Sequence, residues 1–423
     1  MRWLRSFLSS DVLAGEPRDV VLIEAVLAAS KLSIPFLTLY LVQARGFDYA
    51  TAGLFVAIRG LGGLVAVMLA GALADRFGEK PVVLTLLAGA GLSAAAIPQL
   101  HSTHALLLGF FLLGAFVNAV QPAFSSLVVR AIPVRQWTEV YAAEYWALNV
   151  GFAFTALVGG RVAVFAFDWL FYLEAAGTFV ALGLVARILP QTRPRPQAAR
   201  PRKPRRSLRS RSRRALAAVS LAARDRLAVV LISSSLLFSM CLSQMTGTLP
   251  LDMEASGYSP DFYGYVIFWN GALLTVFQIR AGRAIARRRG MRILARAATV
   301  AALGYGLLAL PHQHLVLILA CLTIWTIGEM MDAPVRNAVV SALAEPCSRA
   351  RYLGLLSAAL TLGYCIGPWI GGWVLQVVGR EALWLGTAAC ALLCGLIRRA
   401  ITPRVERRMA LSRQASLGSS GRG

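Results

Sequence analysis

Charged side chains interrupt several strongly apolar stretches of this chain, and their spacing places them in small groups. Glu24 and Lys31 stand seven residues apart in the first apolar stretch, so they share one face of a helix. Glu329, Asp332 and Arg336 have the three-and-four spacing of a single helical stripe. A carboxylate in a low-dielectric environment beside a cation can bind and release a proton as its surroundings change. These residue types therefore predict proton binding inside an apolar environment.

The elements that position these charges are predicted to be membrane spans. The chain has 423 residues, of which 57% are hydrophobic and only 15% charged, with a mean hydropathy of +0.63. A soluble domain carries about 25% charged residues, so the composition predicts an all-α polytopic membrane protein. Helical spans need about 20 mostly apolar residues. Twelve such stretches begin near Val20, Ala50, Pro81, Ala105, Val140, Trp169, Leu227, Phe262, Ile293, Leu315, Leu353 and Ala382.

The net charge of +23 follows the predicted topology. Basic residues cluster at 191–226, 280–292 and 398–422, whereas the short loop 250–261 carries three acids and no base. The positive-inside rule then places both termini in the cytoplasm. The basic segments are expected to face anionic lipid headgroups of the bilayer, and we predict no nucleic-acid partner. Only three of the 43 basic residues are lysines, a bias that suggests a bacterial inner-membrane protein.

An internal repeat divides the chain into two halves. Four residues recur at a spacing of 211, namely Gly53, Gly60, Gly71 and Arg76 as Gly264, Gly271, Gly282 and Arg287. Three more recur at a spacing of 212, namely Gly151, Gly159 and Gly160 as Gly363, Gly371 and Gly372. We predict a six-helix half at 1–189, a basic cytoplasmic linker at 190–226, a second six-helix half at 227–401 and a cytoplasmic tail at 402–423.

The turn from Gly71 to Lys80, GALADRFGEK, resembles the loop between the second and third helices of the major facilitator superfamily. Gly71 allows a neighbouring helix to come close, and Arg76 and Lys80 hold the loop in the cytoplasm. The resemblance implies a gating role for this motif, which includes Gly78, with Asp75 contacting the start of the eleventh helix.

Glycines in the fifth and eleventh spans resemble a motif of drug/proton antiporters in the same superfamily. The copies read Asn149-x-Gly151 with Gly159-Gly160, and Gly363-x-x-x-Gly367-Pro368-x-x-Gly371-Gly372. Phe110 stands where that family often has an arginine. Segments around Arg59 and Glu329 are similar to multidrug exporters. The resemblance implies a central cavity lined by the first, fourth, seventh and tenth helices, with the binding site near the membrane midplane.

We hypothesise that Glu329 or Asp332 titrates during transport, with Lys31 and Arg59 as counter-charges. An alternative is that Lys31 and Glu329 pair across the two halves and never titrate. Several polar residues could contact substrate, although bonding between helices is the expected role for most of them. They are Asn118, Gln121, Asn149, Gln244 and Asn270. Glu174, on the sixth helix, is assigned a packing or pairing role.

The predicted function is proton-coupled export of small amphipathic organic compounds by alternating access, by a monomer. An alternative is an importer or facilitator of a small anionic solute, which Lys31 and Arg59 would bind directly. An enzyme is not expected, because the chain has no HExxH, no GxSxG at a strand-to-helix turn and no Walker loop. No cofactor or metal site is predicted.

Overall fold

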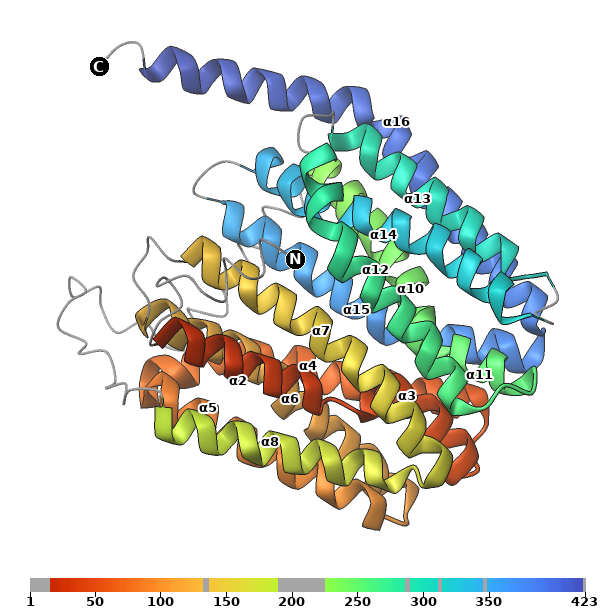
Figure 1. Cartoon of the computed structure of the whole chain (residues 1–423). Coiled ribbons are helices and arrows are strands. Elements are labelled where there is room, and N and C mark those ends of the chain that lie inside the picture. Colours follow the sequence, from red (N-terminus) through yellow and green to blue (C-terminus); the bar gives the residue numbers. More distant parts are fainter. Residues whose placement is uncertain are drawn as a thin grey trace. The chain divides into compact units, whose positions relative to one another are not determined.

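The computed structural model describes residues 16–131, 137–188, 225–285, 290–310, 314–344 and 348–420 (Figure 1). Helices joined by short turns make up these ranges, and no β-strand occurs within them. In chain order the elements are α2 (Glu16–Ser30), α3 (Ser33–Leu39), η2 (Tyr40–Ala44), α4 (Tyr49–Phe77), α5 (Glu79–Ala96), η3 (Ile97–Gln99), α6 (Thr103–Ala131), α7 (Trp137–Phe165), α8 (Asp168–Ile188), α10 (Arg226–Gly247), α11 (Leu249–Ala255), α12 (Pro260–Ile285), α13 (Gly290–Leu307), α14 (Leu315–Leu343), α15 (Arg349–Val377) and α16 (Arg380–Ser420).

Ten helical segments among the described residues are long and apolar enough to cross a membrane. All twelve predicted spans begin within or beside a helix, and the two that fall short of this criterion are α12 and α13. Both carry arginines, Arg280 and Arg283 in α12 and Arg292 and Arg296 in α13. The predicted all-α polytopic fold is confirmed.

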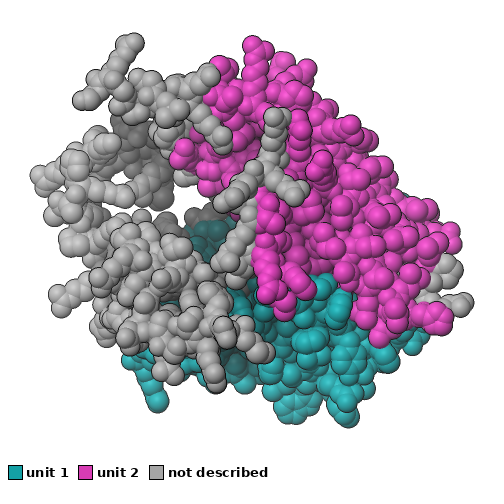
Figure 2. Space-filling view, turned by 45° about the horizontal axis from the view of Figure 1, so that its top comes forward, with its two compact units in different colours: residues 1–196, 245–275, 368–376 teal, residues 197–244, 276–367, 377–423 magenta. Residues whose placement is uncertain are grey.

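The chain forms two compact units (Figure 2). Unit 1 comprises residues 1–196, 245–275 and 368–376, and unit 2 comprises residues 197–244, 276–367 and 377–423. The boundaries at residues 189, 226 and 401 stay predictions, and residues 190–224 of the predicted linker lie outside the described residues. Helix α16 runs through the predicted boundary at residue 401 without interruption.

The first predicted span is not one continuous helix. Pro35 has no amide hydrogen, and its ring clashes with the carbonyl group four residues earlier, which belongs to Lys31. The helix is accordingly interrupted at Lys31 and Leu32, between α2 and α3 (Figure 1). A π-helical segment, η2, then ends the span at Ala44. The break leaves backbone groups at mid-span that need partners outside their own helix.

Glycines on α7 and α8 let these helices pack closely against α2. A Cβ on Gly151 of α7 would lie 2.4 Å from the Ala28 side chain on α2. One on Gly177 of α8 would lie 2.6 Å from the Cβ of Ser30, at the last position before the break. Side chains larger than hydrogen do not fit at these crossings, so α2 is packed closely between α7 and α8.

Two of the repeated glycines mark a crossing of α4 with α15 in unit 1. A Cβ on Gly53 of α4 would lie 2.3 Å from the Pro368 carbonyl oxygen. One on Gly372 of α15 would lie 2.3 Å from the Tyr49 carbonyl oxygen. The two backbones therefore touch at the ends of these helices that the charge distribution predicts to be extracellular.

The copies of these residues mark a second crossing in unit 1, of α12 with α7. A Cβ on Gly264 would lie 2.5 Å from the Ala156 carbonyl oxygen, and one on Gly160 would lie 3.0 Å from the Cα of Asp261. Arg161 also pairs with Asp261 across this crossing at 3.5 Å. The repeat thus corresponds to two equivalent places where helices meet backbone to backbone.

The motif assigned to gating lies at the turn between α4 and α5. Gly78 adopts a φ of 90°, which favours glycine over residues with side chains. Lys80 is only 8% exposed and donates to the Ala186 carbonyl oxygen of α8 at 2.8 Å, and its role in holding the loop in the cytoplasm stays a prediction. Arg76 is exposed and lies over the Phe77 ring. Gly71 and Asp75 belong to the last two turns of α4, and the predicted contact of Asp75 with the eleventh helix stays a prediction.

Asp225 joins three helices at the predicted cytoplasmic end of unit 2. It precedes α10 and accepts hydrogen bonds from the Tyr352 hydroxyl of α15 at 2.8 Å and from Arg408 of α16 at 2.7 Å. Partial burial alone would raise the pKa of Asp225, but these hydrogen bonds outweigh burial and lower the pKa below its ordinary value. The carboxylate therefore stays charged at neutral pH.

We predict that Asp225→Asn lowers the apparent unfolding temperature at neutral pH. The loss of a charged acceptor costs about 1.5 kcal/mol, or roughly 3 to 6 °C for a domain of this size. Because the folded pKa lies below the unfolded one, this stability is present above the unfolded pKa and is lost as the pH falls through the folded pKa. Thermal unfolding in detergent over a pH series measures it. Asp168→Asn, at an exposed acid in the first turn of α8, is the control and should shift less.

Candidate functional site

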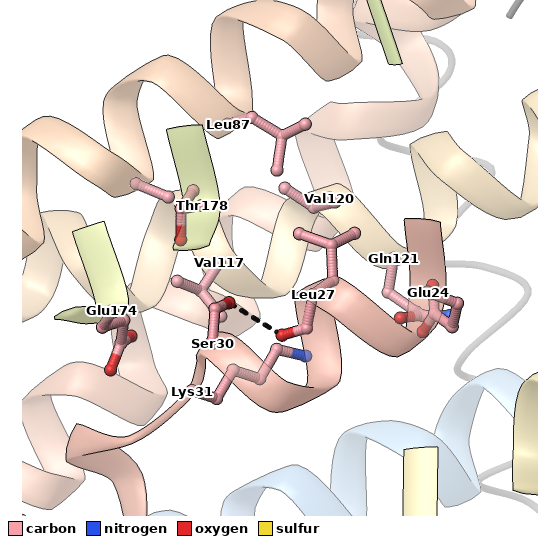
Figure 3. Close-up of a pocket in the computed structure, with 11 residues that line it drawn as sticks. Glu24, Leu27, Ser30, Lys31, Leu87, Val117, Val120, Gln121, Glu174 and Thr178 are labelled. Atoms are coloured by element: carbon pink, nitrogen blue, oxygen red, sulfur yellow. Dashed lines mark hydrogen bonds between the residues drawn. The ribbon is translucent and has the colours of Figure 1, made fainter. Parts of the chain in front are cut away.

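A small pocket lies within the N-terminal six helices (Figure 3). Apolar side chains from α2, α5 and α6 form much of its wall, and charged or polar side chains from α2, α6 and α8 face it. The lining residues are Glu24, Leu27, Ser30, Lys31, Leu87, Ala90, Val117, Val120, Gln121, Glu174 and Thr178.

Glu24 lies at one end of this pocket on α2 and is 1% exposed. Gln121 of α6 shares a side-chain hydrogen bond with it, and the two residues lie together in Figure 3. Its other carboxylate oxygen, Oε1, is buried without a hydrogen-bond partner. Glu144 of α7 is also buried, and its charge and that of Glu24 act on one another. Two buried carboxyl groups therefore lie close enough for their charges to interact.

Lys31 stands at the break in the first span and is partly buried. The charges of Glu24 and Glu174 both act on its ammonium group, and Figure 3 shows its side chain between these two residues. No hydrogen bond or ion pair forms at this ammonium group among the described residues. Lys31 is thus a cation placed between two carboxylates without a close contact to either.

Glu174 of α8 contacts the other side of the break. Its Oε2 atom accepts hydrogen bonds from the Ser33 amide at 3.0 Å and from the Ser33 hydroxyl at 2.5 Å. Glu174 is 2% exposed, and its Oε1 atom is buried without a hydrogen-bond partner. The carboxylate therefore caps the first amide of α3 from a different helix.

Arg59 of α4 is the second cation of this region, because its charge acts on both Lys31 and Glu174. Gly114 allows α6 to cross α4 here, since a Cβ on it would lie 1.8 Å from the Arg59 carbonyl oxygen. Phe110, at the position where the antiporter resemblance expects an arginine, is fully buried. The centroid of its ring lies 5.6 Å from that of Phe55 and 6.1 Å from that of Phe171, so an aromatic cluster occupies that position.

Asp332 of α14 lies in a separate network within unit 2. It pairs with Arg336 on its own helix and accepts a hydrogen bond from Arg398 of α16 at 2.6 Å. Arg398 is fully buried and also donates to the Leu294 carbonyl oxygen at 3.1 Å and to the Ser234 hydroxyl at 3.2 Å. Asp332 thus has two arginine partners in its own half, whereas the sequence predicts Lys31 and Arg59 as counter-charges.

Glu329 lies one turn before this network and is partly exposed. Its charge acts on the hydroxyl groups of Tyr305 and Tyr364. The pairing of Glu329 with Lys31, which belong to different units, stays a prediction.

The remaining polar candidates differ in their contacts. Gln244 donates to the Gly367 carbonyl oxygen at 2.9 Å and so joins α10 to α15. Asn118 donates to the Gly114 carbonyl oxygen of its own helix at 2.9 Å. Asn149 is partly buried, and Asn270 is 1% exposed. The contact of Gln244 is of the interhelical kind that the sequence favours for most of this group, whereas the Asn118 bond stays within α6.

The family model of the Major Facilitator Superfamily matches residues 25–331 and 253–419, which together cover most of the chain. The chain belongs to the Major Facilitator Superfamily. This family member is a multi-pass membrane transporter of small molecules and not an enzyme, as the sequence predicts.

Its relatives are distant. It is 23% identical to an uncharacterized MFS-type transporter, YqjV, of Bacillus subtilis, over 83% of this chain and 84% of the relative. It is 22% identical to a Na(+), Li(+), K(+)/H(+) antiporter of Planococcus maritimus, over 83% and 89%. It is 24% identical to the multidrug resistance protein MdtH of Yersinia pestis, over 89% and 92%. The alignments span nearly the whole transporter.

Solved structures show the same fold. The nucleoside transporter NupG matches with a TM-score of 0.74 and 14% identity, covering 91% of this chain and 98% of that chain. A peptide transporter, POT, in complex with sulfate matches with a TM-score of 0.75 and 17% identity, covering 93% and 95%. At these identities the likeness concerns the fold of the transporter alone.

Sequence reasoning missed two residues of this transporter, Ser33 and Arg398, that the structure brings into buried polar contacts, and it did not identify Ser33 as the partner of Glu174. Glu174 and Ser33 meet at the break, which Pro35 signals two residues after Ser33. Arg398 is grouped by sequence with the basic cytoplasmic tail, yet it follows the buried Cys394 by four residues and so shares its inward face.

Proposed function

We propose that this transporter exports small amphipathic organic compounds across the bacterial inner membrane in exchange for protons. One observation carries the proposal. Glu24 and Glu174 are both almost fully buried, line one pocket and lie on either side of Lys31. Acids at membrane depth are costly and mark proton or substrate pathways. A carboxylate there gains or loses a proton as the pocket opens to water on one side or the other.

The direction and the substrate class rest on the pocket wall and on the relatives. The apolar wall of the pocket, with Leu27, Leu87 and Val120, suits an organic compound with an apolar body. The relatives include one protein named for multidrug resistance and one named as a cation/proton antiporter. We propose that the transporter works as a monomer with both termini in the cytoplasm.

The test is retention of fluorescent cations, dyes and antibiotics in an efflux-deficient bacterial host. We expect cells with the wild-type chain to retain at least one compound less, and a protonophore to remove the difference. Glu24→Gln should abolish the part of export that the protonophore removes. Glu329→Gln tests, in the same assay, the carboxylate that the sequence predicts to titrate. Glu381→Gln, at an exposed acid in the first turn of α16, is the matched control and should export as the wild type does. Equal retention by wild-type and empty cells across the panel contradicts export.

A second candidate function is import or facilitated passage of a small anionic solute. The observation that favours it is the Lys31 ammonium group, which makes no hydrogen bond or ion pair among the described residues and has Arg59 nearby. Lys31→Gln and Arg59→Gln would then abolish solute binding itself. Under the export proposal the same two variants alter the pH dependence of transport, and their binding of a fluorescent cation from the panel stays measurable.

A further inference from the structure

We infer that Glu174 binds a proton and that its protonation loosens the break in the first span. The inference rests on the proposed proton coupling, because it names a residue through which a bound proton changes the backbone of the first span. Sequence reasoning assigns Glu174 a packing or pairing role, and the carboxylates it considers for titration are Glu329 and Asp332.

The backbone at the break depends on Glu174. Pro35 prevents a regular hydrogen bond to the Lys31 carbonyl group, so α3 starts afresh at Ser33. The Ser33 amide has no acceptor in its own helix and donates to Glu174 instead. A buried amide without an acceptor costs about 1–3 kcal/mol, so the start of α3 is sensitive to the state of this carboxylate.

The helices on either side of the Glu174–Ser33 contact are closely packed. Gly177, one turn after Glu174 on α8, brings that helix so close that a Cβ on Gly177 would lie 2.6 Å from Ser30. The hydroxyl of Ser30 donates to Leu27 of its own helix at 2.9 Å and not to Glu174. Two serines therefore flank the break, and of these two only Ser33 donates hydrogen bonds to Glu174.

Protonation changes what Glu174 can accept. Its Oε2 atom already receives both Ser33 donors, whereas Oε1 is buried without a partner and can take a proton from water that enters the pocket. The neutral acid accepts more weakly than the carboxylate, because hydrogen bonds to a charged group are the stronger ones. It also loses its attraction to the two cations that act on it, Lys31 and Arg59.

The charges around Glu174 allow this change. Lys31 at the break and Arg59 on α4 act on it directly, and Glu24 on α2 acts on Lys31 from the far side. Glu144 on α7 acts in turn on Glu24. When Glu174 becomes neutral, Glu24 is the remaining carboxylate whose charge acts on Lys31. The bound proton thus alters both the cap of α3 and the balance of charge at the break.

Infrared difference spectroscopy of the full chain in lipid nanodiscs tests the inference without a substrate. A pH titration should show a carbonyl stretch of a buried carboxylic acid that is lost in Glu174→Gln. This variant keeps an oxygen acceptor for Ser33, so it should remain folded, as size-exclusion chromatography will show. Ser33→Ala removes one donor to the carboxylate, so the midpoint should move up by about one pH unit, a tenfold change in proton affinity. Ser30→Ala should leave it in place.

Hydrogen exchange of a peptide covering residues 30–36 supplies the second readout. At a pH below the midpoint, the wild type, with a neutral Glu174, should exchange at about the same rate as Glu174→Gln, and above the midpoint the wild type should exchange more slowly. The inference is overturned if no band depends on Glu174, if Ser33→Ala and Ser30→Ala share one midpoint, or if exchange does not follow the titration. A failure of the proposed function appears elsewhere, as wild-type transport that ignores the proton gradient.

Discussion

Arg398→Leu should remove most of the folded protein. Arg398 is fully buried and holds together α10, α13, α14 and α16 through Ser234, Leu294 and Asp332. Leucine would leave Asp332 with Arg336 as its one arginine partner among the described residues and would strip three acceptors of a donor. Removing one member of a buried ion pair costs about 3–5 kcal/mol, a large part of the 5–15 kcal/mol that stabilises a typical protein.

Fluorescence-detected size-exclusion chromatography of a tagged chain measures this loss. Arg399→Leu is the matched control, because Arg399 is the next residue of the same helix and is exposed. We expect the Arg398→Leu peak to fall by at least about tenfold while the control keeps its monodisperse peak. A loss of about 3 kcal/mol lowers the ratio of folded to unfolded protein by more than about a hundredfold. Equal peaks for the two variants would show that the network contributes little to stability.

Gly53→Ala should shift the transporter away from the conformation described above. The added Cβ would lie 2.3 Å from the Pro368 carbonyl oxygen, and backbone cannot yield as a flexible side chain can. Overpacking of this kind costs about 1–3 kcal/mol. Because the contact joins α4 to α15, the cost falls on the state in which the two helices touch. The population of that state should decrease about 5- to 150-fold relative to a state in which they separate.

The measurement is the reactivity of a cysteine at Ala52 toward a membrane-impermeant maleimide, in a chain without its six native cysteines. Ala52 is fully buried beside this crossing, so the reaction should be slow with Gly53 and faster with alanine there. Initial rates of dye export should fall in parallel. Gly282→Ala is the control, because a Cβ at Gly282 meets nothing within 4 Å. Unchanged reactivity at Ala52 in Gly53→Ala would contradict the prediction.

The break at Lys31 illustrates why part of the site escapes sequence reasoning. Glu24 and Lys31 at a spacing of seven suggest one face of an unbroken helix, and the pocket does contain both. Pro35 interrupts that helix, however, and the amide it leaves at Ser33 is satisfied by a residue 141 positions away. The need for a distant acceptor can be read from a proline, but its identity cannot.

Composition and periodicity by themselves determined the fold class and the approximate starts of the spans, because apolar length and charge placement are local properties of the chain. The repeat spacing also located four glycines at which helices cross, Gly53, Gly160, Gly264 and Gly372, since glycine allows two helix backbones to come close. Only the tertiary structure decided which charges meet, placing Glu174 at the break and Arg398 on Asp332. Which buried charges pair depends on which faces of distant helices pack together. The fit of many side chains throughout the bundle decides that packing.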